Sequence, residues 1–206
     1  MQTGTPDPNV TWQPSASDSA LRHRCARQRG VTAWMTGLSG AGKSTVAGAA
    51  ERMLLEAGHL TFMLDGDNLR HGLNAGLGFD AAGRQEAVRR AGEAALLVAE
   101  SGVFAIVAMI SPFRSDRAQV RARHEAAGVP FLEVFVDAGL ATAEARDPKG
   151  LYARARKGEI SAFTGVSDPY EPPPAPALRL RTDRVGVEDC ARALVDAILA
   201  ASAHNP

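Results

Sequence analysis

Residues 37–44 have the sequence Gly37-Leu38-Ser39-Gly40-Ala41-Gly42-Lys43-Ser44 and match the pattern G-x-x-x-x-G-K-[ST]. The apolar run 31–36 precedes them, and a helical stripe of apolar residues begins after them at Val46. A strand before the pattern and a helix after it are the context in which it forms a P-loop. The sequence therefore predicts a P-loop that holds the phosphates of a nucleoside triphosphate, and ATP is the one expected.

The residue types of this loop suit phosphate binding. Glycines let successive backbone N–H groups face the phosphates, and the N-terminus of the following helix adds a favourable dipole. We expect Lys43 to reach the β and γ phosphates and Ser44 to be a ligand of Mg²⁺. The predicted contacts to ATP are Gly37, Leu38, Ser39, Gly40, Ala41, Gly42, Lys43, Ser44 and Thr45.

Strands alternate with helices along the rest of the chain. Apolar runs predict strands over 31–36, 60–64, 103–110, 131–136 and 178–180. Helical stripes predict helices over 44–57, 82–101 and around 187–198, and Pro112 and Gly128 bound a further expected helix from 112 to about 128. This order predicts a three-layer α/β fold of the P-loop NTPase type, with a parallel sheet of about five strands flanked by helices. Ligands of such sheets bind beyond the carboxyl ends of the strands.

Composition and charge indicate the general class of protein to which the chain belongs. The chain has 206 residues, of which 45% are hydrophobic, and its formal net charge is zero, so nothing favours a nucleic acid or a membrane surface as partner. No apolar run approaches the length of about 20 residues that spans a bilayer, and the first 30 residues lack the apolar core of a signal peptide. Cys25 and Cys190 make no disulfide framework, and we expect both to be reduced and structural. We expect a cytoplasmic enzyme.

The chain divides into two parts, and the second contains a predicted lid. Residues 1–30 are predicted to be a mobile N-terminal tail, whose basic segment 22–29 is either solvated or a contact for a ligand or another chain. Residues 31–206 form the predicted P-loop domain. Within it, residues 146–170 lack hydrophobic periodicity, and stretches of this kind are commonly lids that exclude water from a site.

Polar residues follow the predicted strands. The segment Asp65-Gly66-Asp67-Asn68 comes directly after the second strand, where a carboxylate could accept a proton or position Mg²⁺. The alternative is a turn that caps the next helix, for which Asp67 is also suited. Ser111 ends the central strand, and its hydroxyl either touches a substrate or caps a helix that begins at Pro112.

Five arginines follow these segments, and arginine makes bidentate contacts with phosphate or sulfate. They indicate an anionic second substrate, although each one could instead lie on a solvated helix face. Because Arg89 and Arg90 are adjacent, at most one of the two is expected in the site. The five are Arg84, Arg89, Arg90, Arg114 and Arg117.

Motifs spread over residues 31–200 resemble those of the adenylylsulfate kinase family. The matching segments are 37–44, 65–68 with 70–74, 77–79, 110–114, 133–137, 145–152 and 163–165, together with Arg84, Arg89 and Arg90. The resemblance implies that ATP, with Mg²⁺, phosphorylates the 3′-hydroxyl of adenosine 5′-phosphosulfate (APS). The products would be ADP and 3′-phosphoadenosine 5′-phosphosulfate (PAPS), as in sulfate assimilation. It also implies a homodimer.

The resemblance further implies catalytic roles. Asp65 or Asp67 would act as the base or orient the 3′-hydroxyl, and Asp65 is favoured. Ile110 and Ser111 would contact the substrate, and Lys149 would line its site. Ser111 matches a serine often labelled a phosphoserine intermediate, yet in-line transfer from ATP needs only positioning and charge stabilisation.

The same resemblance implies how the two nucleotides are held. Arg70 and Arg84 would bind the phosphosulfate of APS. Phe79 and Phe163 would sandwich its adenine, and such stacking contributes about 1–3 kcal/mol per base. Arg146 would support the bound ATP or the lid.

One position departs from the family pattern. The family has Arg-x-Glu-Asn-Ile-Arg-Arg, whereas residues 84–90 are Arg-Gln-Glu-Ala-Val-Arg-Arg. Ala87 replaces an asparagine that would offer the substrate a hydrogen bond, a loss of about 1 kcal/mol. One alternative is therefore a 3′-hydroxyl kinase of a related nucleotide. A second, of another class, is a non-catalytic nucleotide-binding module that regulates a partner.

Overall fold

Five parallel strands form one sheet in a computed structural model that describes residues 9–11, 13 and 15–203. The strand order is β2-β3-β1-β4-β5, so that β1, which leads into the P-loop, is central. The strands are β1 (Thr32–Thr36), β2 (Thr61–Asp65), β3 (Phe104–Ala108), β4 (Phe131–Val136) and β5 (Leu178–Leu180). The predicted α/β fold with a five-stranded parallel sheet is confirmed.

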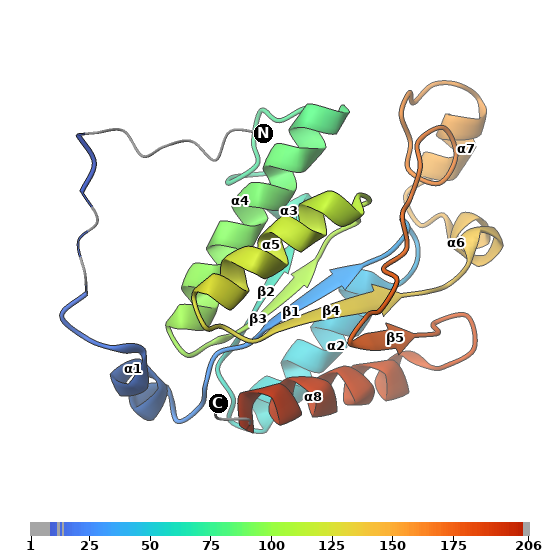
Figure 1. Ribbon diagram of the computed structural model, residues 1–206. Helices are drawn as coiled ribbons and strands as arrows, with labels where there is room; N and C mark the ends of the chain where they lie inside the picture. Colours follow the sequence, from blue (N-terminus) through green and yellow to red (C-terminus); the bar gives the residue numbers. More distant parts are fainter. Residues whose placement is uncertain (1–8, 12, 14, 204–206) are drawn as a thin grey trace.

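Helices cover both faces of this sheet (Figure 1). On one face, α2 (Lys43–Glu56) and α8 (Val187–Ala203) bury Leu54 and Leu194 against the sheet. On the other, α4 (Ala81–Glu100) and α5 (Arg114–Ala126) bury Val88 and Val120. The central strands β1 and β3 are buried on both faces, which explains why β3 is entirely apolar and β1 is apolar between its two terminal threonines.

Three short helices stand at the carboxyl end of the sheet. They are α3 (Gly66–Leu69), which follows β2 directly, α6 (Leu140–Arg146) and α7 (Leu151–Arg156). Figure 1 shows α6, α7 and the loop that returns to β5 gathered beyond the tips of the strands. The segment 146–170 therefore contains one helix of its own, α7, which the sequence pattern did not predict.

The N-terminal region also contains a helix that was not predicted. Helix α1 (Ser19–Ala26) is capped by Asp18, whose side chain accepts a hydrogen bond from the backbone N–H of Leu21 at 2.7 Å. It buries none of its residues, so it has no apolar stripe from which a helix could be predicted. The predicted tail is thus helical over 19–26, while residues 1–8, 12 and 14 lie outside the described part of the chain.

The two cysteines differ in their surroundings. Cys190 is buried in the core, as expected, but Cys25 is exposed on α1, so its expected structural role is wrong. Both are free thiols. Among the described residues, the helices are too short or too polar for any of them to cross a membrane.

Candidate active site

The P-loop connects β1 to α2 and has the backbone that its glycines permit. Gly42 is the N-cap of α2 with φ +96°, and Gly40 has φ +72°. A Cβ at Gly40 would lie 2.6 Å from the carbonyl oxygen of Ala143 in the middle of α6. Larger residues are excluded here because the loop packs tightly against α6, which precedes the predicted lid.

Lys43 is buried within this loop. Its Nζ donates to the carbonyl oxygens of Gly37 at 2.9 Å and Leu38 at 2.8 Å. Burial lowers the pKa of Lys43 from 10.5 to about 8, although the nearby Asp65 and Asp67 oppose this shift. The ammonium is therefore held at the loop by neutral acceptors, which the oxygens of a bound triphosphate could replace with charged ones.

Ser44 and Asp65 bring two oxygens together at the start of α2. Ser44 Oγ donates to Asp65 Oδ2 at 2.6 Å, and Asp65 lies at the end of the neighbouring strand β2. Among the described residues no three His, Cys, Asp or Glu side chains cluster as a complete metal cage. A hydroxyl and a single carboxylate fit Mg²⁺, which keeps several waters and takes its remaining ligands from substrate phosphates.

Asp65 also caps α3. Its Oδ1 accepts from the backbone N–H groups of Asp67 at 2.9 Å and Asn68 at 3.3 Å. The turn that the sequence offered as an alternative is therefore present, but Asp65 makes it, and the expectation that Asp67 could be the N-cap is wrong. The three hydrogen bonds fix the Asp65 carboxylate in one orientation.

Asp67 faces the predicted lid instead. Its side chain is 66% exposed and forms an ion pair with Lys149, from the segment before α7. Two of the predicted site residues, one from α3 and one from the predicted lid, are thus in direct contact.

Arg84 on α4 makes a second contact with the predicted lid. From the first turn of α4 its guanidinium donates to the Ala162 carbonyl and the Thr164 hydroxyl, and it lies 3.9 Å from Asp168. Its Nε also donates to the carbonyl of Phe79 at 2.6 Å. Arg84 therefore joins the α3–α4 connection to the far end of the segment 146–170.

Arg70 and Phe79 form a pair beside Arg84. The Arg70 guanidinium lies 3.9 Å from the centre of the Phe79 ring and donates to the carbonyl of Leu77 at 2.9 Å. The Phe79 ring is 65% exposed. Phe163, by contrast, is buried, with its ring edge-on to Tyr152 at 5.0 Å. The predicted sandwich of Phe79 and Phe163 remains a prediction.

Ser111 has an unusual backbone conformation and a buried hydroxyl. Its φ is +38°, and its Oγ accepts from the indole Nε1 of Trp34 at 3.0 Å. The preceding Ile110 is held through its carbonyl, which accepts from Thr36 Oγ1 at 2.7 Å. Helix α5 begins at Arg114 with Phe113 as its N-cap, so the alternative in which Ser111 caps a helix starting at Pro112 is wrong.

Arg146 lies against the P-loop together with Thr182, a residue that the sequence analysis missed. Arg146 Nη2 donates to the Thr182 carbonyl at 2.6 Å, and Thr182 Oγ1 donates to the carbonyl of Ala41 at 2.7 Å. Thr182 is the second residue after β5. Its position shortly after a predicted strand could have indicated a site residue, but Thr182 belongs to no recognised sequence motif.

The remaining arginines of the predicted cluster have other partners. Arg89 and Arg90 both donate to Glu86 at 2.7 Å. Arg114 donates to the carbonyl of Pro172 at 2.8 Å, and Arg117 is buried. Of the five, Arg84 is the one placed at the cleft between the strand ends and the segment 146–170.

Ala87 is buried on α4, one turn after Arg84. The Asn74 amide donates to its carbonyl at 3.3 Å, and Asn74 Oδ1 is buried without a hydrogen-bond partner among the described residues. Ala87 itself has no side-chain donor that could satisfy this oxygen.

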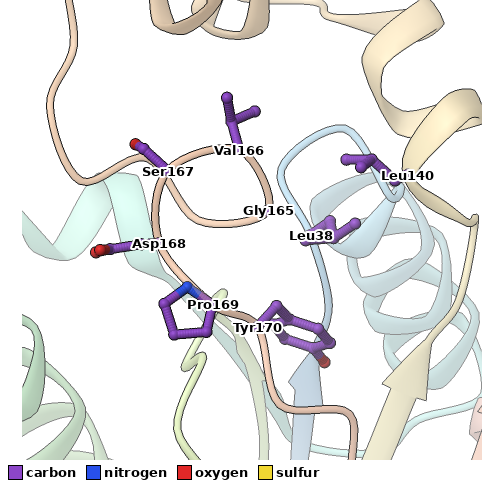
Figure 2. A pocket seen from close by; sticks show the side chains of 8 residues that line it. All are labelled: Leu38, Leu140, Gly165, Val166, Ser167, Asp168, Pro169 and Tyr170. Carbon is purple, nitrogen blue, oxygen red and sulfur yellow. The ribbon is translucent and has the colours of Figure 1, made fainter.

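A cavity of about 480 Å³ opens between the P-loop and the end of the segment 146–170 (Figure 2). Leu38 and Leu140 form one wall, and residues 165–170 form the other. Leu38 belongs to the predicted P-loop and residues 165–170 to the predicted lid, whereas the sequence assigned no role to Leu140.

Known proteins match the chain over this whole region. A family model described as adenylylsulphate kinase matches residues 29–181. The adenylyl-sulfate kinase of Saccharomyces cerevisiae is 48% identical over 191 residues, which cover 93% of this chain and 94% of the yeast protein. That of Shewanella sp. (strain MR-4) is 48% identical over 198 residues and covers 96% of each.

A solved structure is also similar. The APS kinase of Mycobacterium tuberculosis, solved in complex with AMPPNP and APS, is 52% identical and aligns with a TM-score of 0.79. The alignment covers 82% of this chain and 97% of the mycobacterial one.

Proposed function

The chain belongs to the adenylylsulfate kinase family, and from this premise we propose that its carboxyl-end cleft transfers the γ-phosphoryl group of ATP to APS. The protein is an adenylyl-sulfate kinase: it phosphorylates the 3′-hydroxyl of APS and releases PAPS and ADP. The observation that carries this function is the meeting of Lys43, Ser44 and Asp65 at one point beside the P-loop.

The donor side uses the P-loop. The backbone N–H groups of residues 37–44 cradle the phosphates, and Lys43 exchanges its carbonyl acceptors for phosphate oxygens. Ser44 and Asp65 would hold Mg²⁺. When bound, Mg²⁺ neutralises charge on the phosphates during transfer. Arg146 and Thr182, which contact the loop at Gly40 and Ala41, support the bound ATP.

Asp65 is the proposed catalytic carboxylate. It is buried at the end of β2, oriented by three hydrogen bonds and adjacent to the Ser44 hydroxyl. From this position it would orient the 3′-hydroxyl of APS or accept its proton. Asp67, which is exposed and paired with Lys149, would serve the lid instead.

The acceptor side is proposed on the opposite wall of the cleft. Arg70 and Arg84 would bind the phosphosulfate, whose charge would compete for the contacts that Arg84 makes with Ala162 and Thr164. Phe79 and Phe163 would take the adenine between them. Ile110, Ser111 and Lys149 would line the rest of the acceptor site, with Ser111 as a contact and not a covalent intermediate.

Segment 146–170 is the proposed lid of a kinase domain that comprises residues 31–206. The contacts of Arg84 and Lys149 with their partners across the cleft support this assignment, since a lid must close to exclude water. We also propose that the enzyme is a cytoplasmic homodimer and that residues 1–30 stand outside the kinase domain.

The test is ADP release by the purified chain with ATP and Mg²⁺, with and without APS. We expect APS-dependent release whose kcat falls at least about 100-fold in Lys43→Ala and Asp65→Asn, because each removes a group that acts on the transferring phosphoryl or its acceptor. Asp67→Asn is the matched comparison and should keep most of kcat. If Asp67→Asn is inactive and Asp65→Asn turns over normally, the assignment of the two carboxylates is reversed.

The same assay addresses the alternatives that Ala87 raises. A higher kcat/KM for another adenylated or cytidylated nucleotide than for APS would favour a related acceptor. No ADP release with any acceptor would favour a non-catalytic module.

A further inference from the structure

Arg117 is buried to a degree that is rare for a cation. It lies in the first turn of α5, and its side chain is 1% exposed. Removing a guanidinium from water is costly unless a carboxylate and further acceptors compensate for it. Burial of Arg117 therefore requires a hydrogen-bond acceptor for each of its donor groups.

Three separate segments share the Arg117 guanidinium. Nε donates to Glu133 Oε1 on β4 at 2.6 Å, Nη1 to the carbonyl of Ser111 at 2.7 Å, and Nη2 to the carbonyl of Glu171 at 2.7 Å. The other oxygen of Glu133 accepts from Arg121 at 2.9 Å. Only a planar group with donors on three sides can make these contacts together, so a lysine would lose most of them.

Ser111 is the contact that needs support. Its φ of +38° is a conformation that residues other than glycine seldom adopt, and such residues persist where their surroundings hold them. Its carbonyl also accepts from Thr36 Oγ1 at 3.3 Å, and its hydroxyl accepts from Trp34 Nε1 at 3.0 Å. Arg117 makes the shorter of the two hydrogen bonds to this carbonyl.

Glu171 directly follows the proposed lid. Its N–H donates to the Pro112 carbonyl at 3.0 Å, and its carboxylate accepts from the backbone N–H of Arg114 at 2.7 Å. The preceding Tyr170 lies with its hydroxyl 3.0 Å from Thr36 Oγ1. The C-terminal end of the lid is thus fastened to the same loop that contains Ser111.

We propose that Arg117 is a positioning residue for the acceptor: it holds Ser111 and the C-terminal end of the lid at a fixed separation. It acts through these two segments and touches neither ATP nor APS. The inference rests on the proposed function, because it takes Ile110 and Ser111 to face APS. Since the P-loop makes none of these contacts with Arg117, the donor side should be unaffected.

The test compares steady-state kinetics of Arg117→Lys and Arg117→Met with those of Arg121→Met. Arg121 also pairs with Glu133, but it is 34% exposed and contacts neither Ser111 nor Glu171. We expect both Arg117 variants to raise the KM for APS at least about fivefold while the KM for ATP changes less than about twofold. Arg121→Met should change neither KM by more than about twofold.

A second variant keeps the proposal testable if both Arg117 variants fail to fold. Trp34→Phe removes the donor to the Ser111 hydroxyl and keeps an aromatic ring in the core; we expect a selective rise in the KM for APS of about threefold. Equal rises in both KM values, or unchanged values in folded variants, would overturn the proposal. If the wild-type chain shows no APS-dependent ADP release, the proposed function is refuted instead.

Discussion

At the scale of single residues, Lys43 combines a binding role with a cost to folding. Its pKa is about 8 in the folded protein, against 10.5 when it is exposed. Folding must therefore bury a charged ammonium below pH 8. Between these two values the unfolded chain binds more protons than the folded one, so this cost is relieved as pH rises.

We predict that the stability difference between the wild-type chain and Lys43→Met shifts in favour of the wild type between pH 7 and pH 9.5. The expected gain is about 1–2 kcal/mol, from a shift of this size at 1.4 kcal/mol per pKa unit. Urea unfolding of the ligand-free proteins at both pH values measures it. Both proteins share every other titrating group, so a constant difference would mean that Lys43 is not desolvated.

Single site residues could be predicted where a motif or a strand end marks them. Lys43 and Ser44 are marked by the P-loop pattern, and Asp65 is marked by the end of a strand. The structure places the three close together. The N-cap of α5 could not be predicted, because Phe113 caps the helix without a side-chain hydrogen bond and so carries no capping signal in the sequence. The burial of Arg117 could not be predicted either, since Glu133 and Glu171 are its partners only in the folded chain.

At the scale of elements, the N-terminal helix α1 is attached to the domain by Gln28, just beyond its end. The Gln28 amide donates to the carbonyls of Leu60 at 2.8 Å and Gly102 at 2.9 Å, and its Oε1 accepts from the N–H of Leu60 at 3.0 Å. These contacts join the ends of the segments that precede β2 and β3. They are far from the P-loop, at the opposite end of the sheet (Figure 1).

We predict that Gln28→Ala lowers the free energy of unfolding by about 1–2 kcal/mol, because three backbone groups of Leu60 and Gly102 lose a hydrogen-bond partner. Its kinetic constants for ATP and APS should stay within about twofold of the wild type. Arg24→Ala, on the exposed face of α1, is the matched control and should change neither property. Chemical denaturation measures the free energy of unfolding, and steady-state kinetics measure the constants for ATP and APS. A lower kcat of Gln28→Ala at saturating ATP and APS would connect α1 to catalysis.

Helices with an apolar stripe or clear boundary residues could be predicted, and those with neither could not. α2, α4 and α8 each bury several apolar residues at helical spacing. α5 buries mainly polar residues and was predicted from Pro112 before it and Gly128 after it. α1 buries none, and α6 and α7 have only seven and six residues, too few for a period of 3.6 to stand out. The unpredicted helices lie outside the two hydrophobic clusters on the faces of the sheet, and α6 and α7 bury Ala143 and Tyr152 in a separate small cluster.

At the scale of the whole molecule, the site is built by every strand of the sheet. The P-loop follows β1, Asp65 ends β2, Ile110 and Ser111 follow β3, and Thr182 follows β5. β4 contributes Glu133, which holds Arg117. This common edge was predictable, because parallel strands present their carboxyl ends on one side. The order of the strands was not, since it depends on which pairs of strands hydrogen-bond in the folded chain.

Because the site joins so many segments, ligands should stabilise the domain as a unit. A ligand at 100 times its Kd adds about 2.7 kcal/mol to the folded state. For a chain of this size each kcal/mol raises Tm by about 2–4 °C, so AMPPNP with Mg²⁺ should raise it by about 5–10 °C. APS added afterwards should raise it further, because the proposed partners of its phosphosulfate include Arg84, which connects α4 with the proposed lid.

Lys43→Ala and Arg84→Ala separate the two ligand effects in the same thermal unfolding experiment. The first should lose most of the shift with AMPPNP, and the second most of the additional shift with APS, since each removes one ligand's charged partner. An APS shift that survives in Arg84→Ala would place the phosphosulfate elsewhere. Shifts lost together in both variants would mean that the lid, and not separate contacts, controls access to the two nucleotides.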